Sequence, residues 1–345
     1  MTDNTRTTSS KVTLGDVATQ AGVSPAAASL ALRGRRGVSD ETRRRVVEVA
    51  SSLGYRTRSA SERSESLTVG VLVKAKEGMM VDVDAFYGPI LSGITAEASL
   101  AGVDLRLASL PVDENFDPIE VPRAVQSDEI DGLLVLGAHL TDRSIERIAP
   151  NPVVLVDGYC DPPHRFSSVT ADNIGGAMAA TQHLIDLGHE HIALVGTAPT
   201  TFPSILDRRR GYQATMAAAG LAPHFVDGPH DEPDLLATQF VLELERHPEL
   251  TAVFAANDDA AIAIMRALGD EIPGRLSLVG FDNIAASAVI QPSLDTIAVD
   301  KSALGRLALT LVAHRIRHVD DPAITASVPA RLVVRDSSGP PRHLH

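Results

Sequence analysis

Hydrophobic positions along the chain follow two different periods, which change near residue 60. Between residues 13 and 53, apolar residues recur every three to four positions, as on one face of a helix. From residue 67 onward, short continuous apolar runs of strand length alternate with amphipathic segments of helix length. The pattern predicts a small helical module followed by a larger body in which strands and helices alternate.

Three short helices are predicted in the helical module. Thr13 can cap a first helix that stops at Gly22. Ser24 can cap a second helix with Pro25 at its first position, where the missing N–H of proline costs nothing. Ser39 can cap a third. A tight turn between the first two helices is typical of a helix-turn-helix, whose second helix enters the major groove of DNA.

The body is predicted to be a parallel α/β structure. Amphipathic segments such as 177–187 and 260–268 separate seven apolar runs of strand length. These runs are LTVGVLV (67–73), DLRLAS (104–109), GLLVLG (132–137), PVVLVD (152–157), HIALVG (191–196), AVFAAN (252–257) and SLVGFD (277–282). Strand–helix alternation favours doubly wound parallel sheets. A body of about 270 residues is large for one sheet, so two α/β subdomains are expected.

Charge is distributed unevenly between the two parts of the chain. The 345 residues carry a net charge of −13, with 44% hydrophobic and 22% charged residues, as in a globular protein. The first 60 residues hold ten basic and five acidic residues, a charge of +5, and the remainder carries −18. A basic head on an acidic body indicates that only the head meets a polyanion.

Several function classes lack their sequence signals. No apolar run reaches the roughly 18 residues of a membrane span, and the polar N-terminus contains no signal-peptide core, so a cytoplasmic location is expected. The single cysteine, Cys160, excludes a disulfide framework and a cysteine-rich zinc site. Because no nucleophile elbow or glycine-rich phosphate loop is present, we expect no enzyme activity and no cofactor. His183, His189 and His191 lie around a helix-to-strand connection, where we expect no metal.

Polar residues placed just beyond the apolar runs predict a ligand site. They are Asp157, Asn257, Asp258 and Asp282. Such residues converge on the crevice at the carboxyl ends of parallel strands, and carboxylates and amides suit a hydroxyl-rich ligand. The aromatic content of 3%, without tryptophan, favours a sugar or polyol over a purine. A structural interpretation is also open, in which Asp258 and Asp282 only cap helix starts.

The segments VTLGDVATQAGVSPAAASLAL and VSDETRRRVVEVASSLGY closely resemble the DNA-binding module of the LacI (lactose-repressor) family of bacterial transcription regulators. Segments of the body, among them SSVTADNIGGAMAATQHLIDLGHEHIALVG and DRRRGYQATMAAAGL, are similar to the same family, so the resemblance covers about residues 12–337. The family in turn resembles periplasmic sugar-binding proteins. It implies a chain that crosses three times between two α/β subdomains and leaves a ligand cleft between them.

Pattern and resemblance together predict the domain limits. A disordered tail (1–10) precedes the helix-turn-helix domain (11–55) and a hinge (56–66). The N-terminal subdomain of the core comprises 67–166 and 297–319, the C-terminal subdomain comprises 167–296 and 320–337, and a tail (338–345) follows.

The resemblance implies a set of DNA-contacting residues in the head. Positions that contact DNA or anchor phosphates are matched by Thr13, Leu14, Ser24, Ser29, Ser39 and Thr42, and base-reading positions by Pro25, Ala26 and Leu30. Because proline and alanine offer only apolar contact, we hypothesise that discrimination depends on DNA shape and on Arg33, Arg35 and Arg36. An equally open interpretation is that these arginines only hold phosphates. The hinge departs from the family, since it lacks the leucine that would wedge into the minor groove.

The resemblance also implies an effector site. Arg208 matches the family's effector-clamping arginine, Asp282, Asn257 and Asp157 match further anchors, and Phe86 and Tyr87 match the aromatic pair at the cleft mouth. The sequence thus predicts a transcription repressor that binds a palindromic operator as a homodimer and responds to a sugar or polyol. The alternative is a cytosolic sugar-binding module with a degraded, non-switching head. An enzyme acting on a sugar is a distant third interpretation, which needs paired carboxylates in the cleft.

Overall fold

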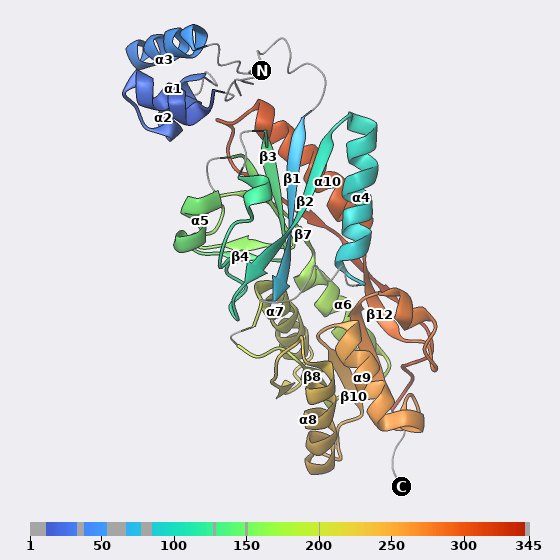
Figure 1. Ribbon diagram of the computed structural model, residues 1–345. Coiled ribbons are helices and arrows are strands. Elements are labelled where there is room, and N and C mark those ends of the chain that lie inside the picture. Colours follow the sequence, from blue (N-terminus) through green and yellow to red (C-terminus); the bar gives the residue numbers. More distant parts are fainter. Residues whose placement is uncertain are drawn as a thin grey trace, which may run out of the picture. The chain divides into compact units, whose positions relative to one another are not determined.

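The computed structural model describes residues 12–32, 38–53, 67–76, 85–126, 129–148, 151–199 and 201–341. The chain divides into two compact units, residues 1–66 and 67–345, which Figure 1 shows. Within the described ranges, no helix combines the length and the apolar character that crossing a membrane requires.

The first unit is a three-helix module with a core of small side chains. Its helices are α1 (Leu14–Ala21), α2 (Pro25–Leu32) and α3 (Asp40–Ser52). All three contribute buried residues, namely Val17, Ala18, Ala21, Ala28, Ala31, Val46 and Ala50. All seven are alanine or valine, small side chains that allow the helices to pack closely. The helical period predicted from the sequence is confirmed.

Polar caps define the beginnings of the three helices. Thr13 and Asp16 form a capping box, in which the Thr13 hydroxyl accepts from the Asp16 N–H (3.3 Å) and the Asp16 carboxylate accepts from the Thr13 N–H (2.8 Å). Ser24 and Ser39 each accept a first-turn N–H, at 3.1 and 3.2 Å. Gly22 ends α1 in the left-handed conformation (φ 66°). All four predicted roles are confirmed.

The N-terminal part of the second unit is built on a six-stranded parallel sheet with the strand order β13-β7-β5-β3-β1-β2. Its strands are β1 (Thr68–Lys76), β2 (Asp104–Val112), β3 (Gly132–Leu136), β5 (Val153–Val156), β7 (Ser167–Ala171) and β13 (Thr325–Val328). The helices α4 (Tyr87–Ala101), α5 (Asp142–Ile148) and α10 (Lys301–Arg317), the 3-10 turn η1 (Arg123–Val125) and a small parallel pair, β4 (His139–Leu140) and β6 (Tyr159–Cys160), accompany the sheet.

The central strands of this sheet are buried on both faces, which explains their continuous apolar sequences. Val71 and Val73 of β1 belong to an apolar cluster that includes residues of α4 and α10, whereas Leu72 belongs to a second cluster. Helices α4 and α10 lie side by side (Figure 1) and approach closely through glycines. A Cβ atom on Gly93 would lie 2.2 Å from the carbonyl oxygen of Ser302.

The C-terminal part is built on a second six-stranded sheet with the order β14-β12-β11-β10-β8-β9. Its strands are β8 (Ile192–Val195), β9 (His224–Val226), β10 (Ala252–Ala255), β11 (Ser277–Asp282), β12 (Asp295–Val299) and β14 (Ala330–Val333). Its helices are α6 (Asn173–Asp186), α7 (Pro203–Ala218), α8 (Pro233–Arg246) and α9 (Asp258–Leu268), with 3-10 turns η2 (Gly269–Glu271) and η3 (Ala285–Ala288). The predicted doubly wound parallel sheets are confirmed, and one edge strand, β14, runs antiparallel to β12.

The strand ladders correct the expected subdomain limits. Strand β7 pairs with β5, so the first sheet extends past the expected limit at residue 166. Strand β12 pairs with β11, so the expected limit at 297 falls inside a strand of the second sheet. Strand β13 returns to the first sheet beside β7, although residues 320–337 were expected in the second. The chain therefore crosses between the sheets after β7, after β12 and between β13 and β14, which confirms three crossings.

Candidate functional site

One buried guanidinium joins the ends of several strands between the two sheets. Arg208 lies on the buried face of α7 and is only 4% exposed. Its Nε donates to the side-chain oxygen of Asn173 (3.0 Å), which follows β7. One terminal nitrogen donates to the carbonyl of Ala256 (2.5 Å), which follows β10, and the other donates to the carboxylate of Asp282 (3.0 Å), the last residue of β11. The structure thus brings Arg208 and Asp282, two of the predicted effector residues, into direct contact.

Aromatic and cationic groups hold this pair in place. The Arg208 guanidinium carbon lies 3.8 Å from the ring centroid of buried Phe281, a cation–π contact. Lys301, at the start of α10, donates through Nζ to the main-chain carbonyls of Asp282 and Asn283. Asp282 and Asn283 adopt positive φ angles of 105° and 50°, a backbone conformation that is costly and is found mainly at ligand sites and turns.

The N-terminal subdomain contributes a second acidic centre. Asp157 directly follows β5 with a positive φ of 44°, and its carboxylate accepts a hydrogen bond from the Tyr87 hydroxyl (3.1 Å). The ammonium group of Lys74 lies 5.3, 4.8 and 5.2 Å from the ring centroids of Tyr87, Phe116 and Phe202. Phe202 belongs to the other subdomain, so these rings span the interface around a single cation.

Burial disfavours the ionised form of a carboxyl group in each subdomain. Burial raises the pKa of Asp157 to about 6, although the charges of Lys74 and Arg208 oppose that shift. Burial likewise raises the pKa of Asp282 against the opposing charges of Arg208 and Lys301. The pKa of Lys301 is lowered, mainly by burial. Carboxylates and an ammonium group are thus buried together here. A polar ligand could supply hydrogen bonds in place of the water that these groups have lost.

A cavity of about 490 Å³ lies beside this group, a size suited to a small ligand. The N-terminal subdomain lines it with Asp113, Asn115, Phe116, Asp117, His139, Thr141 and Arg143, and the C-terminal subdomain with Thr201, Phe202, Pro203 and Leu206. None of the six predicted effector residues lines it. Phe202 packs edge-on against Phe116 (4.9 Å between centroids) and Tyr159 (5.4 Å). The rings therefore connect the cavity to the neighbourhood of Asp157.

The remaining predicted residues of the effector site have structural roles as well. Phe86 packs edge-on against Tyr87, with ring centroids 5.2 Å apart. Asn257 caps α9, accepting from the Ala260 N–H (2.9 Å) and donating to the carbonyl of His230 (3.0 Å).

The idea that Asp258 caps α9 is wrong. Asp258 is completely buried and accepts from the Ile284 N–H (2.9 Å) and from the hydroxyls of Ser287 (2.6 Å) and Thr296 (2.5 Å). Burial raises its pKa to about 7.

The sequence interpretation missed three residues of this group. Lys74, Asn173 and Lys301 were not singled out, although each is placed at or just after the carboxyl end of a strand. Lys74 is the one charged side chain that interrupts the apolar run of β1 before its end, which is a usable sequence signal. The other two follow β7 and β12, strands that were not predicted.

In the first unit, the structure describes part of the predicted DNA-contacting set. Thr13, Ser24 and Ser39 are exposed at helix N-termini, and the hydroxyls of Ser39 and Thr42 are 2.9 Å apart. Leu14 packs against the core of the module. Pro25, Ala26, Ser29 and Leu30 belong to α2, but their side chains lie outside the described part of the chain. Arg33, Arg35, Arg36 and the hinge 56–66 also lie outside the described residues.

Comparison with known proteins agrees with both halves of this architecture. Residues 13–58 match the family model of bacterial regulatory proteins of the lacI family, and residues 181–338 match that of the periplasmic binding protein-like domain. The HTH-type transcriptional repressor CytR of Escherichia coli (strain K12) is 30% identical over 338 residues, covering 94% of this chain and 96% of the relative.

Two solved structures share the fold. A complex of the transcriptional regulator CelR with cellobiose superposes with a TM-score of 0.64 at 25% identity, covering 94% of this chain and 99% of the other. The lac repressor dimer bound to operator and the anti-inducer ONPF superposes with a TM-score of 0.66 at 22% identity, covering 96% and 100%. This chain belongs to the LacI family of bacterial regulatory proteins.

Proposed function

We propose that this protein is a ligand-responsive transcription repressor that binds operator DNA as a homodimer and takes a small hydroxyl-rich effector between its subdomains. The observation that carries the proposal is the placement of Arg208 and Asp282 at the converging strand ends of one subdomain, with Asp157 of the other subdomain within electrostatic range. The relatives support it, since CytR is a repressor and CelR has been solved with cellobiose.

The chemistry of the cleft suits a sugar or polyol. A guanidinium donates in a fixed fork, whereas carboxylates accept from hydroxyl groups, and a polyol offers both donors and acceptors. We propose Arg208, Asp282 and Asp157 as the polar contacts, with Phe86, Tyr87 and Asn257 completing the set. A binding role without catalysis is proposed for this site.

The head is proposed to bind DNA through its helix N-termini and the arginines that follow α2 in the sequence. Exposed caps at Thr13, Ser24 and Ser39 mark helix ends whose N–H groups and dipoles favour phosphate. The charge of +5 over the first 60 residues adds a non-specific attraction. The intact core and caps of the module argue against the alternative of a degraded head. We retain the hypothesis that Arg33, Arg35 and Arg36 contribute to base readout.

Two such heads on one palindrome are proposed because a single small module buries too little surface for specific affinity, and linkage of two raises their effective concentration. The lac repressor, which shares this fold, was solved as a dimer bound to operator. We further propose a cytoplasmic location and these domains: head 11–55, hinge 56–66, and two subdomains that exchange segments after β7, after β12 and between β13 and β14.

The proposal is tested by footprinting the full-length protein on DNA upstream of its own gene, followed by a thermal-shift screen of sugars, polyols and nucleosides. We expect protection of a palindromic site and stabilisation by a sugar or polyol that the Arg208→Met variant does not share. Asp320→Asn, at an exposed turn after α10, is the matched control. Protection of no discrete site, or stabilisation by nucleosides alone, would overturn the corresponding half of the proposal.

A further inference from the structure

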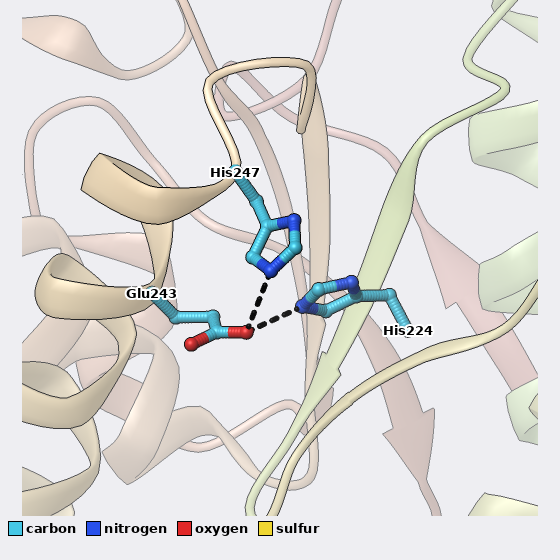
Figure 2. A group of neighbouring side chains, drawn as sticks. All are labelled: His224, Glu243 and His247. Carbon is cyan, nitrogen blue, oxygen red and sulfur yellow. Dashed lines mark hydrogen bonds and ion pairs between the residues drawn. The ribbon is translucent and has the colours of Figure 1, made fainter.

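A separate group of ionisable side chains lies at the far edge of the second sheet, outside the effector site. His224 is the first residue of the edge strand β9, Glu243 lies in the last turn of α8, and His247 directly follows that helix. Figure 2 shows the two imidazole rings turned toward the same carboxylate. Neither β9 nor α8 contributes a residue to the effector site.

The distances within this group match those between the ligands of one metal ion. The Nε2 atoms of His224 and His247 lie 3.0 and 3.4 Å from the Oε1 atom of Glu243. One donor atom from each side chain falls within 4.8 Å of the others. Around a tetrahedral zinc ion with bonds of about 2.0–2.1 Å, neighbouring ligand atoms are about 3.3 Å apart. The three donors therefore need only small movements to share an ion.

The backbone holds the three residues in this arrangement. Glu243 and His247 are four positions apart, and the His247 N–H donates to the Glu243 carbonyl (2.9 Å), continuing the helical turn. The His224 N–H donates to the hydroxyl of buried Tyr212 (2.9 Å), which also donates to the carbonyl of Ile192 (2.7 Å). Side chains on such fixed supports lose little further freedom when they bind an ion.

A neighbouring carboxylate orients one imidazole for coordination. His247 Nδ1 lies 2.9 Å from the Oε1 atom of Glu249. A carboxylate can only accept there, so Nδ1 carries a proton, and in the neutral Nδ1–H tautomer the Nε2 atom is the one that can coordinate an ion. Histidines that bind metals commonly donate their other N–H to a carboxylate in this way. The hydrogen bond from Nδ1 to Glu249 can persist when Nε2 coordinates an ion.

The surroundings leave the group accessible. The side chains of His224, Glu243 and His247 are 23, 22 and 39% exposed, so a solvated ion can reach them. Arg246, 69% exposed, contacts the second carboxylate oxygen of Glu243 at 3.4 Å and leaves Oε1 to the imidazoles.

We propose that His224, Glu243 and His247 form a binding site for a divalent transition-metal ion, with zinc as the physiological candidate, which joins the end of α8 to the edge strand β9. Two imidazole nitrogens and one carboxylate oxygen are donors that Zn²⁺ accepts, and water completes its coordination.

Isothermal titration of the metal-free, full-length protein with ZnCl₂ tests this site, together with the visible absorption spectrum after addition of Co²⁺. We expect one tight site whose affinity falls at least tenfold in His224→Ala, Glu243→Gln and His247→Ala, with loss of the cobalt spectrum. His314→Ala and His318→Ala are matched controls, because His314 lies in the last turn of α10 and His318 directly follows that helix, with ring centroids 4.6 Å apart. Each should change the affinity less than twofold.

Thermal melting without metal verifies that each variant is folded. If His224→Ala does not fold, the zinc affinity of His247→Ala, whose side chain is more exposed, tests the site instead. Zinc should raise the melting temperature of the wild type and not that of His247→Ala. Unchanged zinc affinity in the three variants would place the ion elsewhere, for example at His343 and His345 of the C-terminal sequence. That result, or the absence of binding, would overturn the proposal and reduce the group to an ion-pair cluster.

Discussion

Asp157 is buried at an energetic cost, so we predict that Asp157→Asn stabilises the protein at neutral pH. The pKa of this carboxyl rises from 3.8 to about 6 in the folded state, so folding disfavours its ionised form. A shift of about 2 pKa units corresponds to about 3 kcal/mol. Below pH 3.8 the carboxyl is protonated in both states and nothing is lost. As pH rises through 6 the cost develops fully, so stability falls over this interval and then levels off.

Asparagine preserves the shape of the protonated acid and can still accept the hydrogen bond from Tyr87. Urea unfolding followed by circular dichroism should therefore show Asp157→Asn to be about 3 kcal/mol more stable than wild type at pH 8 and about equal near pH 3.5. The exposed control Asp320→Asn should differ from wild type by less than about 0.5 kcal/mol at both pH values. The gain should come with weaker effector binding, since the site loses an acceptor.

The reasoning is refuted if Asp157→Asn is equally or less stable than wild type at pH 8. Lys74 and Arg208 would then compensate the buried carboxylate fully, and the site would hold no electrostatic strain for a ligand to relieve.

Three further substitutions test the architecture. Thr13→Ala removes the capping box of α1 and should lower the stability of the head by about 1 kcal/mol in urea unfolding, whereas the exposed Thr19→Ala should stay within about 0.5 kcal/mol. Gly305→Ala places a Cβ 2.1 Å from the carbonyl of Ile90 and should destabilise the core by about 1–3 kcal/mol, seen as a lower melting temperature. Asp258→Ala leaves three buried donors without an acceptor and should cost at least about 3 kcal/mol; wild-type stability would contradict its role.

The elements most clearly predictable from the sequence were those with strong local patterns. The helical head follows from caps at Thr13, Ser24 and Ser39, because side chains three residues apart decide where a helix begins. The long apolar strands also follow from local pattern. Strand β7 alternates between buried and half-buried positions over only five residues, and β13 between exposed and half-buried positions over four. Such short patterns are weak, and only hydrogen bonding with distant segments defines these strands. The subdomain limits depend on those ladders and were therefore misplaced.

The candidate site divides in the same way. Asp157 and Asp282 end clear apolar runs, so their place at a sheet edge was predictable. Asn173 and Lys301 follow strands that were not recognised. The role of Asp258 as a buried acceptor depends on contacts up to 38 residues away in sequence, as between Asp258 and Thr296. No local pattern records such contacts.

The central claim is that a ligand in the cleft controls the affinity of the head for operator DNA, and one coupled titration tests it most directly. Fluorescence anisotropy would measure operator Kd for wild type and Arg208→Met, with and without the sugar identified by the thermal-shift screen, at fixed salt. The account predicts binding at least about a thousandfold tighter than to scrambled DNA, and a sugar-induced change of at least about fivefold in wild type only. Equal affinity for both DNAs, or sugar binding that leaves operator Kd unchanged, would contradict it and favour a ligand-binding protein whose head no longer switches.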